Sequence, residues 1–157
     1  MKINKRRVFI CIAIPVIVGG VAALLTKNSM EVFQSLNQPP LSPPGWLFPV
    51  VWTILYVLMG ISSYLILESQ VDVSEIQKAL RTYGVQLVVN FLWPTFFFNF
   101  GWYLFAFGWL LFLLGLVIYM VRCFWKINRW AVYLNIPYLV WLGFAAYLNL
   151  GVWILNP

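Results

Sequence analysis

Five long stretches without charge constrain this chain more than any other feature. They cover about residues 8–25, 47–67, 81–98, 102–121 and 130–155, and apart from Arg81 none carries a charged side chain. A helix needs about 20 mostly apolar residues to cross the hydrocarbon core of a bilayer. Spanning strands would be about 10 residues long with alternating polarity, and that pattern is missing. The sequence therefore predicts an all-α membrane protein, a bundle of five transmembrane helices forming a single domain over residues 1–157.

The composition excludes several classes of protein. Charged residues make up 9% of the chain and aromatic residues 19%, whereas soluble domains carry about 25% charged residues, so neither a soluble enzyme nor a disordered chain fits. Histidine, the commonest metal and haem ligand, is absent. With only four acidic residues, paired-carboxylate chemistry has few candidates. We therefore predict no metal site and no classical acid–base enzyme.

The basic residues are distributed unevenly between the two ends of the predicted bundle. Only Lys27 falls on one side. The other nine fall on the opposite side: Lys2, Lys5, Arg6, Arg7, Lys78, Arg81, Arg122, Lys126 and Arg129. Cytoplasmic loops hold the excess of Lys and Arg. This predicts an N-terminus inside, a C-terminus outside and a multi-pass protein of a bacterial cytoplasmic membrane. The net charge of +6 is then an orientation signal and does not indicate nucleic-acid binding.

Two features of the first 46 residues need separate interpretation. A basic start, an apolar run and small residues at Ala22–Ala23 would also suit a cleaved signal peptide, although the run is longer than usual. Residues 26–46 form the only long outside loop, and its end is rich in proline. Because proline fixes φ and removes a donor, we expect that end to be stiff and non-helical. We expect residues 68–80 to form a solvated inside loop.

Polar and aromatic residues recur on single faces of three spans. Helical spacing of three and four residues aligns residues in the second, third and fifth spans: Trp52 and Tyr56; Gln86, Asn90, Trp93 and Phe97; Trp141, Ala145 and Asn149. All lie in the outer half of the predicted bundle. Aromatic walls with a few placed polar groups are typical of pockets for flat organic ligands. The competing explanations are the aromatic belt at bilayer interfaces and amides that join helices by hydrogen bonds.

Other residues fit those plainer explanations. Five tryptophans lie close to span ends and suit the belt: Trp46, Trp102, Trp125, Trp130 and Trp153. In the fourth span, Gly101, Gly108 and Gly115 recur every seven residues. Small residues let helices approach closely, so this stripe indicates packing within the bundle or between protomers.

Three motifs, in order along nearly the whole chain, resemble one family. They are Pro39-Pro40-Leu41-Ser42-Pro43-Pro44-Gly45-Trp46 continuing to Trp52 and Tyr56, then Gln86, Asn90, Trp93, Pro94 and Phe97, then Pro137 to Ala145 with Asn149. Together they resemble the translocator protein family, or tryptophan-rich sensory proteins (TspO/MBR), whose mitochondrial members are called peripheral-type benzodiazepine receptors.

The resemblance implies a five-helix bundle, commonly a homodimer, that binds tetrapyrroles such as protoporphyrin IX and drug-like molecules among its helices. It implies a ligand-binding set: Trp46, Trp52, Tyr56, Asn90, Trp93, Phe97, Trp141, Ala145 and Asn149. Trp52 and Trp141 match tryptophans linked to light-dependent porphyrin degradation, and would be catalytic only if that reaction occurs. The chain departs from the family at Val32-Phe33 and Gln38 in the first loop, and it lacks the family's sterol-type pattern after the fifth span.

Three functions follow as expectations. The first is a sensor or regulator of tetrapyrrole metabolism that binds porphyrin as a ligand and needs no cofactor. The second is an enzyme-like light-dependent degradation of porphyrin. The third is a transporter; coupled transporters place ionisable groups within the membrane, and the span interiors contain none, so only passive flux fits.

Overall fold

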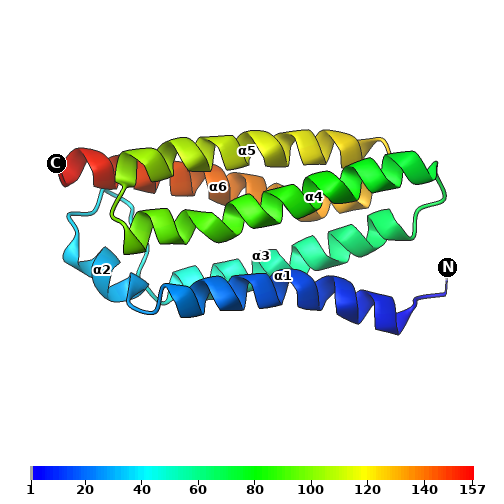
Figure 1. The fold of residues 1–157 in the computed structure, drawn as a ribbon, viewed down its shortest axis with the longest axis horizontal. Coiled ribbons are helices and arrows are strands. Elements are labelled where there is room, and N and C mark those ends of the chain that lie inside the picture. Colours follow the sequence, from blue (N-terminus) through cyan, green and yellow to red (C-terminus); the bar gives the residue numbers. More distant parts are fainter. Residues whose placement is uncertain (1) are drawn as a thin grey trace.

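The computed structural model describes residues 2–157, and this part of the chain is helical with no strand. The five long helices are α1 (Lys5–Leu25), α3 (Leu47–Leu67), α4 (Val73–Pro94), α5 (Tyr103–Trp125) and α6 (Arg129–Leu155). They run side by side along one axis, and the short helix α2 (Ser29–Ser35) lies across one end (Figure 1). The predicted all-helical architecture is confirmed.

The predicted spans agree with the helices to different degrees. The second span coincides with α3, and the first, fourth and fifth differ from α1, α5 and α6 by at most four residues at any end. Four helices, α1, α3, α5 and α6, are long and apolar enough to cross a membrane. The remaining long helix, α4, is not among them, and Glu75, Lys78 and Arg81 lie in its first turns.

The boundary of α4 corrects one expectation. Residues 68–80 were expected to form a loop, but α4 begins at Val73, so the connection is only 68–72. The amides of Glu75 and Ile76 donate to the Asp72 carbonyl at 3.0 and 3.2 Å, which starts the helix. Acidic residues favour the positive end of a helix dipole. Asp72 and Glu75 therefore begin a helix inside the segment expected to be a loop.

The other end of α4 widens into a π-helical turn, η1 (Thr95–Asn99). Pro94 has no N–H to donate into the helix, and after it the Phe100 amide donates to the Thr95 carbonyl at 3.1 Å, five residues back. Such turns interrupt an α-helix locally and are frequent at functional sites. This one turns the chain toward α5 and places Phe97 and Phe98 on the inner side of the bundle.

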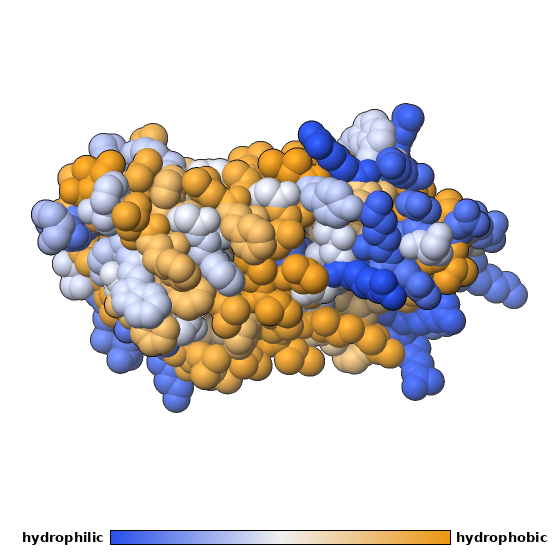
Figure 2. All heavy atoms as spheres, turned by 45° about the horizontal axis from the view of Figure 1, so that its top comes forward, coloured by the Kyte–Doolittle hydropathy of each residue, from blue (hydrophilic) through white to orange (hydrophobic). Residues whose placement is uncertain are grey.

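The surface has an apolar middle and two polar ends. Figure 2 shows the hydrophilic side chains gathered mainly at the end that holds the N-terminus, with an apolar band along the middle of the bundle. The connections 68–72 and 126–128 lie at this same end (Figure 1), which brings nine of the ten basic residues together there. We call this the basic end, and we call the opposite end, which holds α2 and the C-terminus, the lid end.

The glycine stripe of α5 lies outside the packed core. Gly108 and Gly115 are exposed, and a Cβ added at either position would meet no atom within 4 Å. Packing within the bundle is therefore not what these two glycines serve in this chain. Gly101 has a different role, since its φ of 65° forms the turn between η1 and α5 and favours a residue without a Cβ.

Candidate functional site

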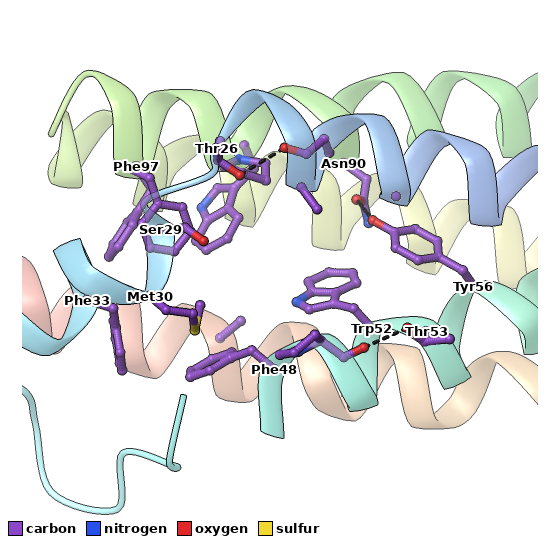
Figure 3. Close-up of a pocket in the computed structure, with 18 of the residues that line it drawn as sticks. Thr26, Ser29, Met30, Phe33, Phe48, Trp52, Thr53, Tyr56, Asn90 and Phe97 are labelled. Atoms are coloured by element: carbon purple, nitrogen blue, oxygen red, sulfur yellow. Dashed lines mark hydrogen bonds between the residues drawn. The ribbon is translucent and has the colours of Figure 1, made fainter. Parts of the chain in front are cut away.

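A cavity of about 370 Å³ lies in the lid half of the bundle, bounded by α1, α2, α3, α4 with η1, and α6. Its size falls within the range of about 300–1,000 Å³ found for small-molecule sites. Figure 3 shows the Trp52 indole projecting from α3 into this space, with Phe48 beside it and Thr26, Ser29 and Phe97 at the lid end. We call this space the main cavity.

Eight of the nine residues expected to bind ligand line the main cavity: Trp52, Tyr56, Asn90, Trp93, Phe97, Trp141, Ala145 and Asn149. They share one cavity because each set occupies one face of a helix, and that face is directed inward. Trp46 does not join them; it precedes α3 and 67% of its surface is exposed. Its place at the end of a span agrees with the aromatic belt.

Aromatic rings form much of the wall, and they hold one another in place. Trp52 stacks on Tyr56 with ring centroids 5.5 Å apart and meets Tyr138 edge-on at 6.3 Å. Trp93 stacks on Phe97 at 5.2 Å. Offset stacking and edge contacts of this kind stabilise aromatic pairs. The wall is therefore formed by rings whose orientations are already set before any ligand enters.

The amides of the site are bonded to the protein. Asn90 accepts from the Tyr56 hydroxyl at 2.8 Å and donates to the Tyr138 hydroxyl at 2.6 Å. Tyr138 in turn donates to Gln86 at 2.8 Å. This buried chain joins α3, α4 and α6 beneath the cavity. Satisfied polar networks rigidify a core. Asn90 therefore holds three helices together by hydrogen bonds, which is the role that the explanation of interhelical amides predicts for it.

Asn149 is bonded in the same way. It accepts from the indole N–H of Trp93 at 3.1 Å and donates to the Tyr103 carbonyl at 2.8 Å. The Trp141 indole N–H differs, because it is buried and has no hydrogen-bond partner within residues 2–157. An unpaired buried donor is costly, so the Trp141 indole is a fully buried donor of the wall that is left unsatisfied within residues 2–157.

Residues from the first 45 positions were missed by the sequence reasoning. The lining residues from α1 and its C-cap are Val16, Gly19, Gly20, Ala22, Ala23 and Thr26. Those from α2 are Ser29, Met30 and Phe33. The small residues of α1 leave room beside the larger rings of α3. They were visible in the sequence, where Ala22–Ala23 also suggested a cleavage site, but small residues alone do not show which helix they face.

The lid end is covered by α2, and the proline-rich segment after it is attached to α6. Residues 36–46 contain no helix, as expected, and Pro39 packs against Gly151, where an added Cβ would lie 2.5 Å from the Pro39 ring. None of the prolines between 39 and 44 lines the main cavity. The cover therefore has two parts, a helix over the cavity and a stiff segment that anchors it.

The ionisable groups of metal and acid–base sites are missing from the main cavity. Its lining has no Asp, Glu, Lys, Arg or Cys, and residues 2–157 contain no group of three His, Cys, Asp or Glu side chains able to hold a metal. The one ion pair of this part of the chain, Arg7 with Glu68 at 2.6 Å, lies at the basic end. The arrangement suits binding of an apolar aromatic molecule.

Comparison with known proteins agrees with this geometry. The family model described as TspO/MBR matches residues 11–154. The chain is 31% identical to the tryptophan-rich protein TspO of Chlorobaculum tepidum over 94% of both chains. It is 37% identical to protein CrtK of Rhodobacter capsulatus, over 88% of this chain and 86% of that one. It is also 37% identical to the translocator protein of Ovis aries, over 77% and 72%. The chain is a membrane protein that belongs to the TspO/MBR family.

Proposed function

We propose that this protein binds tetrapyrroles such as protoporphyrin IX in the main cavity and acts as a sensor or regulator of tetrapyrrole metabolism. The observation that carries the proposal is a cavity of about 370 Å³ with Trp52, Trp93 and Trp141 in its wall. A porphyrin is flat and largely apolar, and indole rings contact such faces by stacking or by their edges. The membership in the TspO/MBR family supports the same ligand class.

The chemistry of the wall favours a porphyrin held by its faces. Axial ligation of haem iron uses His, Cys, Tyr, or Met paired with His. The chain has no histidine and the main cavity has no cysteine, so Met30 in its lining lacks the histidine with which it would be paired. The Tyr56 hydroxyl already donates to Asn90. We therefore expect metal-free protoporphyrin to bind more tightly than haem.

The proposal includes a membrane arrangement. All five long helices cross the bilayer, the basic end lies in the cytoplasm and the lid end lies outside, in agreement with the excess of basic residues on the cytoplasmic side of membrane proteins. The membrane is a bacterial cytoplasmic membrane, and the protein is a homodimer. The exposed glycines of α5, Gly108 and Gly115, leave room for a close approach by a second copy.

Single substitutions test the binding site. We expect Trp52→Ala and Trp141→Ala each to weaken protoporphyrin binding about tenfold, since each removes a large aromatic contact, equivalent to about 1.4 kcal/mol. Binding is measured by titrating purified protein and following the absorbance of the porphyrin, which is independent of the number of tryptophans. Trp130→Ala is the matched control, because Trp130 is 71% exposed and lies at the basic end. Equal affinities for all four proteins would contradict the proposal.

Light-dependent degradation is the second candidate, favoured by the position of Trp52 and Trp141 together on the cavity wall. Porphyrin excited by light generates reactive oxygen from dioxygen, and oxidisable indoles in contact with it would take part. This needs no acid–base residue. If the absorbance of bound porphyrin falls in the light, stays constant in the dark, and falls more slowly in the two tryptophan variants, the protein degrades its ligand. Constant absorbance in both conditions leaves the sensor as the function.

A further inference from the structure

The main cavity does not provide for the charged part of a porphyrin. Protoporphyrin carries two carboxylates, and the lining of the main cavity has no basic side chain. Several polar groups on the inner wall are already bonded within the protein: Tyr56 with Asn90, Asn149 with Trp93 and Tyr103, and Thr53 with the Pro49 carbonyl. The unpaired indole N–H of Trp141 is a neutral donor and carries no charge to balance a carboxylate. A carboxylate buried without a partner is very costly. A ligand with an acidic group must therefore place that group outside the main cavity.

A second, smaller pocket lies next to the main cavity at the lid end. Its volume is about 210 Å³, and it is lined by Leu24, Leu25, Lys27, Asn28, Ser29, Val32, Phe98 and Asn99. Ser29 and Phe98 also line the main cavity, so the two spaces share a wall. Figure 3 shows the Ser29 side chain at the same end of the main cavity as Thr26 and Phe97. We call this space the rim pocket.

The rim pocket contains the one basic residue of the lid end. The other nine basic residues lie at the basic end, and Lys27 stands alone here. No ion pair involves Lys27 within residues 2–157, and Glu31, the acid nearest to it in the sequence, lines neither pocket. An ammonium group offers three donors. A cation without an ion-pair partner is thus available in a pocket that shares a wall with the apolar main cavity.

Neighbouring groups complete a polar lining. The Asn28 side chain makes no capping hydrogen bond to α2, which leaves its amide available. Asn99 donates to the Leu25 carbonyl at 3.0 Å, and this bond ties η1 to the end of α1 on one side of the pocket. The lining therefore combines one cation and a free amide with a fixed frame, which suits a carboxylate.

We propose that the rim pocket binds the carboxylate of a ligand whose apolar body occupies the main cavity, with Lys27 as the group that recognises the charge. The inference rests on the proposed function and makes it more specific, because it predicts a preference for acidic over neutral flat ligands. The ring contacts of the main cavity supply most of the affinity, and Lys27 selects among ligands of the same shape.

Two ligands of nearly the same shape test the proposal: protoporphyrin IX, a diacid, and its dimethyl ester, which is neutral. We expect Lys27→Gln to weaken binding of the diacid about two- to fivefold, as for an exposed charge pair, and to leave binding of the ester unchanged. Lys27→Arg should retain the preference, since it keeps the charge. Lys126→Gln is the matched control, because Lys126 is exposed at the basic end. An uncharged detergent without lipid excludes a contribution from lipid phosphate.

The outcomes separate this inference from the proposed function. If wild type binds diacid and ester equally, or if Lys27→Gln weakens both equally, the rim pocket does not read the carboxylate, while binding in the main cavity stands. If neither ligand binds to any of the proteins, both proposals are wrong. The rim pocket is supported if Lys27→Gln weakens binding of the diacid alone. Increasing salt should then weaken binding of the diacid to the wild type and leave its binding to Lys27→Gln unchanged.

Discussion

At Gly60 the backbones of α1 and α3 come closer than a side chain allows. A Cβ at this position would lie 2.5 Å from the Ile12 Cα and 2.7 Å from the Cys11 carbonyl oxygen. Pro15, four residues after Cys11, has no N–H with which to bond that carbonyl, so the oxygen is free to face the neighbouring helix. One residue without a side chain and one without a donor thus set the distance between α1 and α3, and α1 forms a wall of the main cavity.

We expect Gly60→Ala to destabilise the protein by about 1–3 kcal/mol, the usual cost of forcing extra atoms into a packed interface. The measurement is the midpoint of unfolding in detergent, followed by the loss of helical circular dichroism. Gly143→Ala is the control, since a Cβ there meets nothing within 4 Å, and alanine favours a helix more than glycine does. If both variants unfold at the same midpoint as the wild type, the contact at Gly60 has no role in stability.

At the scale of elements, the segment 36–46 is bound to the end of α6 by a small set of hydrogen bonds. The backbone N–H of Asn37 donates to the side-chain oxygen of Asn156 at 3.0 Å, and the side-chain NH₂ of Asn156 donates to the backbone carbonyl of Asn37 at 2.9 Å. Farther along, the Tyr147 hydroxyl donates to the Pro40 carbonyl at 2.6 Å. Because this segment joins α2 to α3, its attachment holds α2 over the main cavity.

Asn156→Ala should loosen this attachment without unfolding the bundle. It removes both bonds to Asn37, and since exposed bonds contribute about 1 kcal/mol each, we expect hydrogen exchange at the backbone amides of residues 36–38 to become several-fold faster. Asn28→Ala serves as the control, because the Asn28 side chain makes no hydrogen bond to α2. Unchanged exchange in Asn156→Ala would mean that the prolines and the Pro39 contact alone fix the segment.

At the scale of the whole molecule, the uneven charge of the two ends predicts one orientation in the membrane. Reporter fusions after residues 70, 100, 128 and 157 test it, since these points lie in the three connections 68–72, 100–102 and 126–128 and at the C-terminus. Alkaline phosphatase needs disulfides and is active only in an oxidising compartment. We expect activity after residues 100 and 157 and none after 70 and 128.

This pattern also tests whether α4 crosses the membrane despite its charged first turns. Residues 70 and 100 lie on its two sides. A green fluorescent reporter at the same points is the complementary control, because it fluoresces on the cytoplasmic side. Equal phosphatase activity after residues 70 and 100 would show that α4 does not cross, and an inverted pattern at all four points would reverse the orientation.

Local sequence patterns predict the helices and the inward faces of three of them. Uncharged runs long enough to span a bilayer define α1, α3, α5 and α6, because a helix satisfies its own backbone in lipid. Helical spacing predicted the inward faces of α3, α4 and α6, since residues three and four apart share a face. Trp52, Asn90 and Trp141 could therefore be named in advance. Lys27 was noted only as an exception to the charge rule.

Which helices face one another, and what each polar group bonds to, depends on contacts between distant parts of the chain. The walls from α1 and α2 followed from the crossing at Gly60 and from the attachment of residues 36–46 to α6, and no local pattern encodes either contact. The same holds for Asn90 and Asn149, whose partners lie 34 to 56 residues away. Periodicity describes one helix at a time, whereas a cavity, its cover and the rim pocket beside Lys27 exist only where several helices meet.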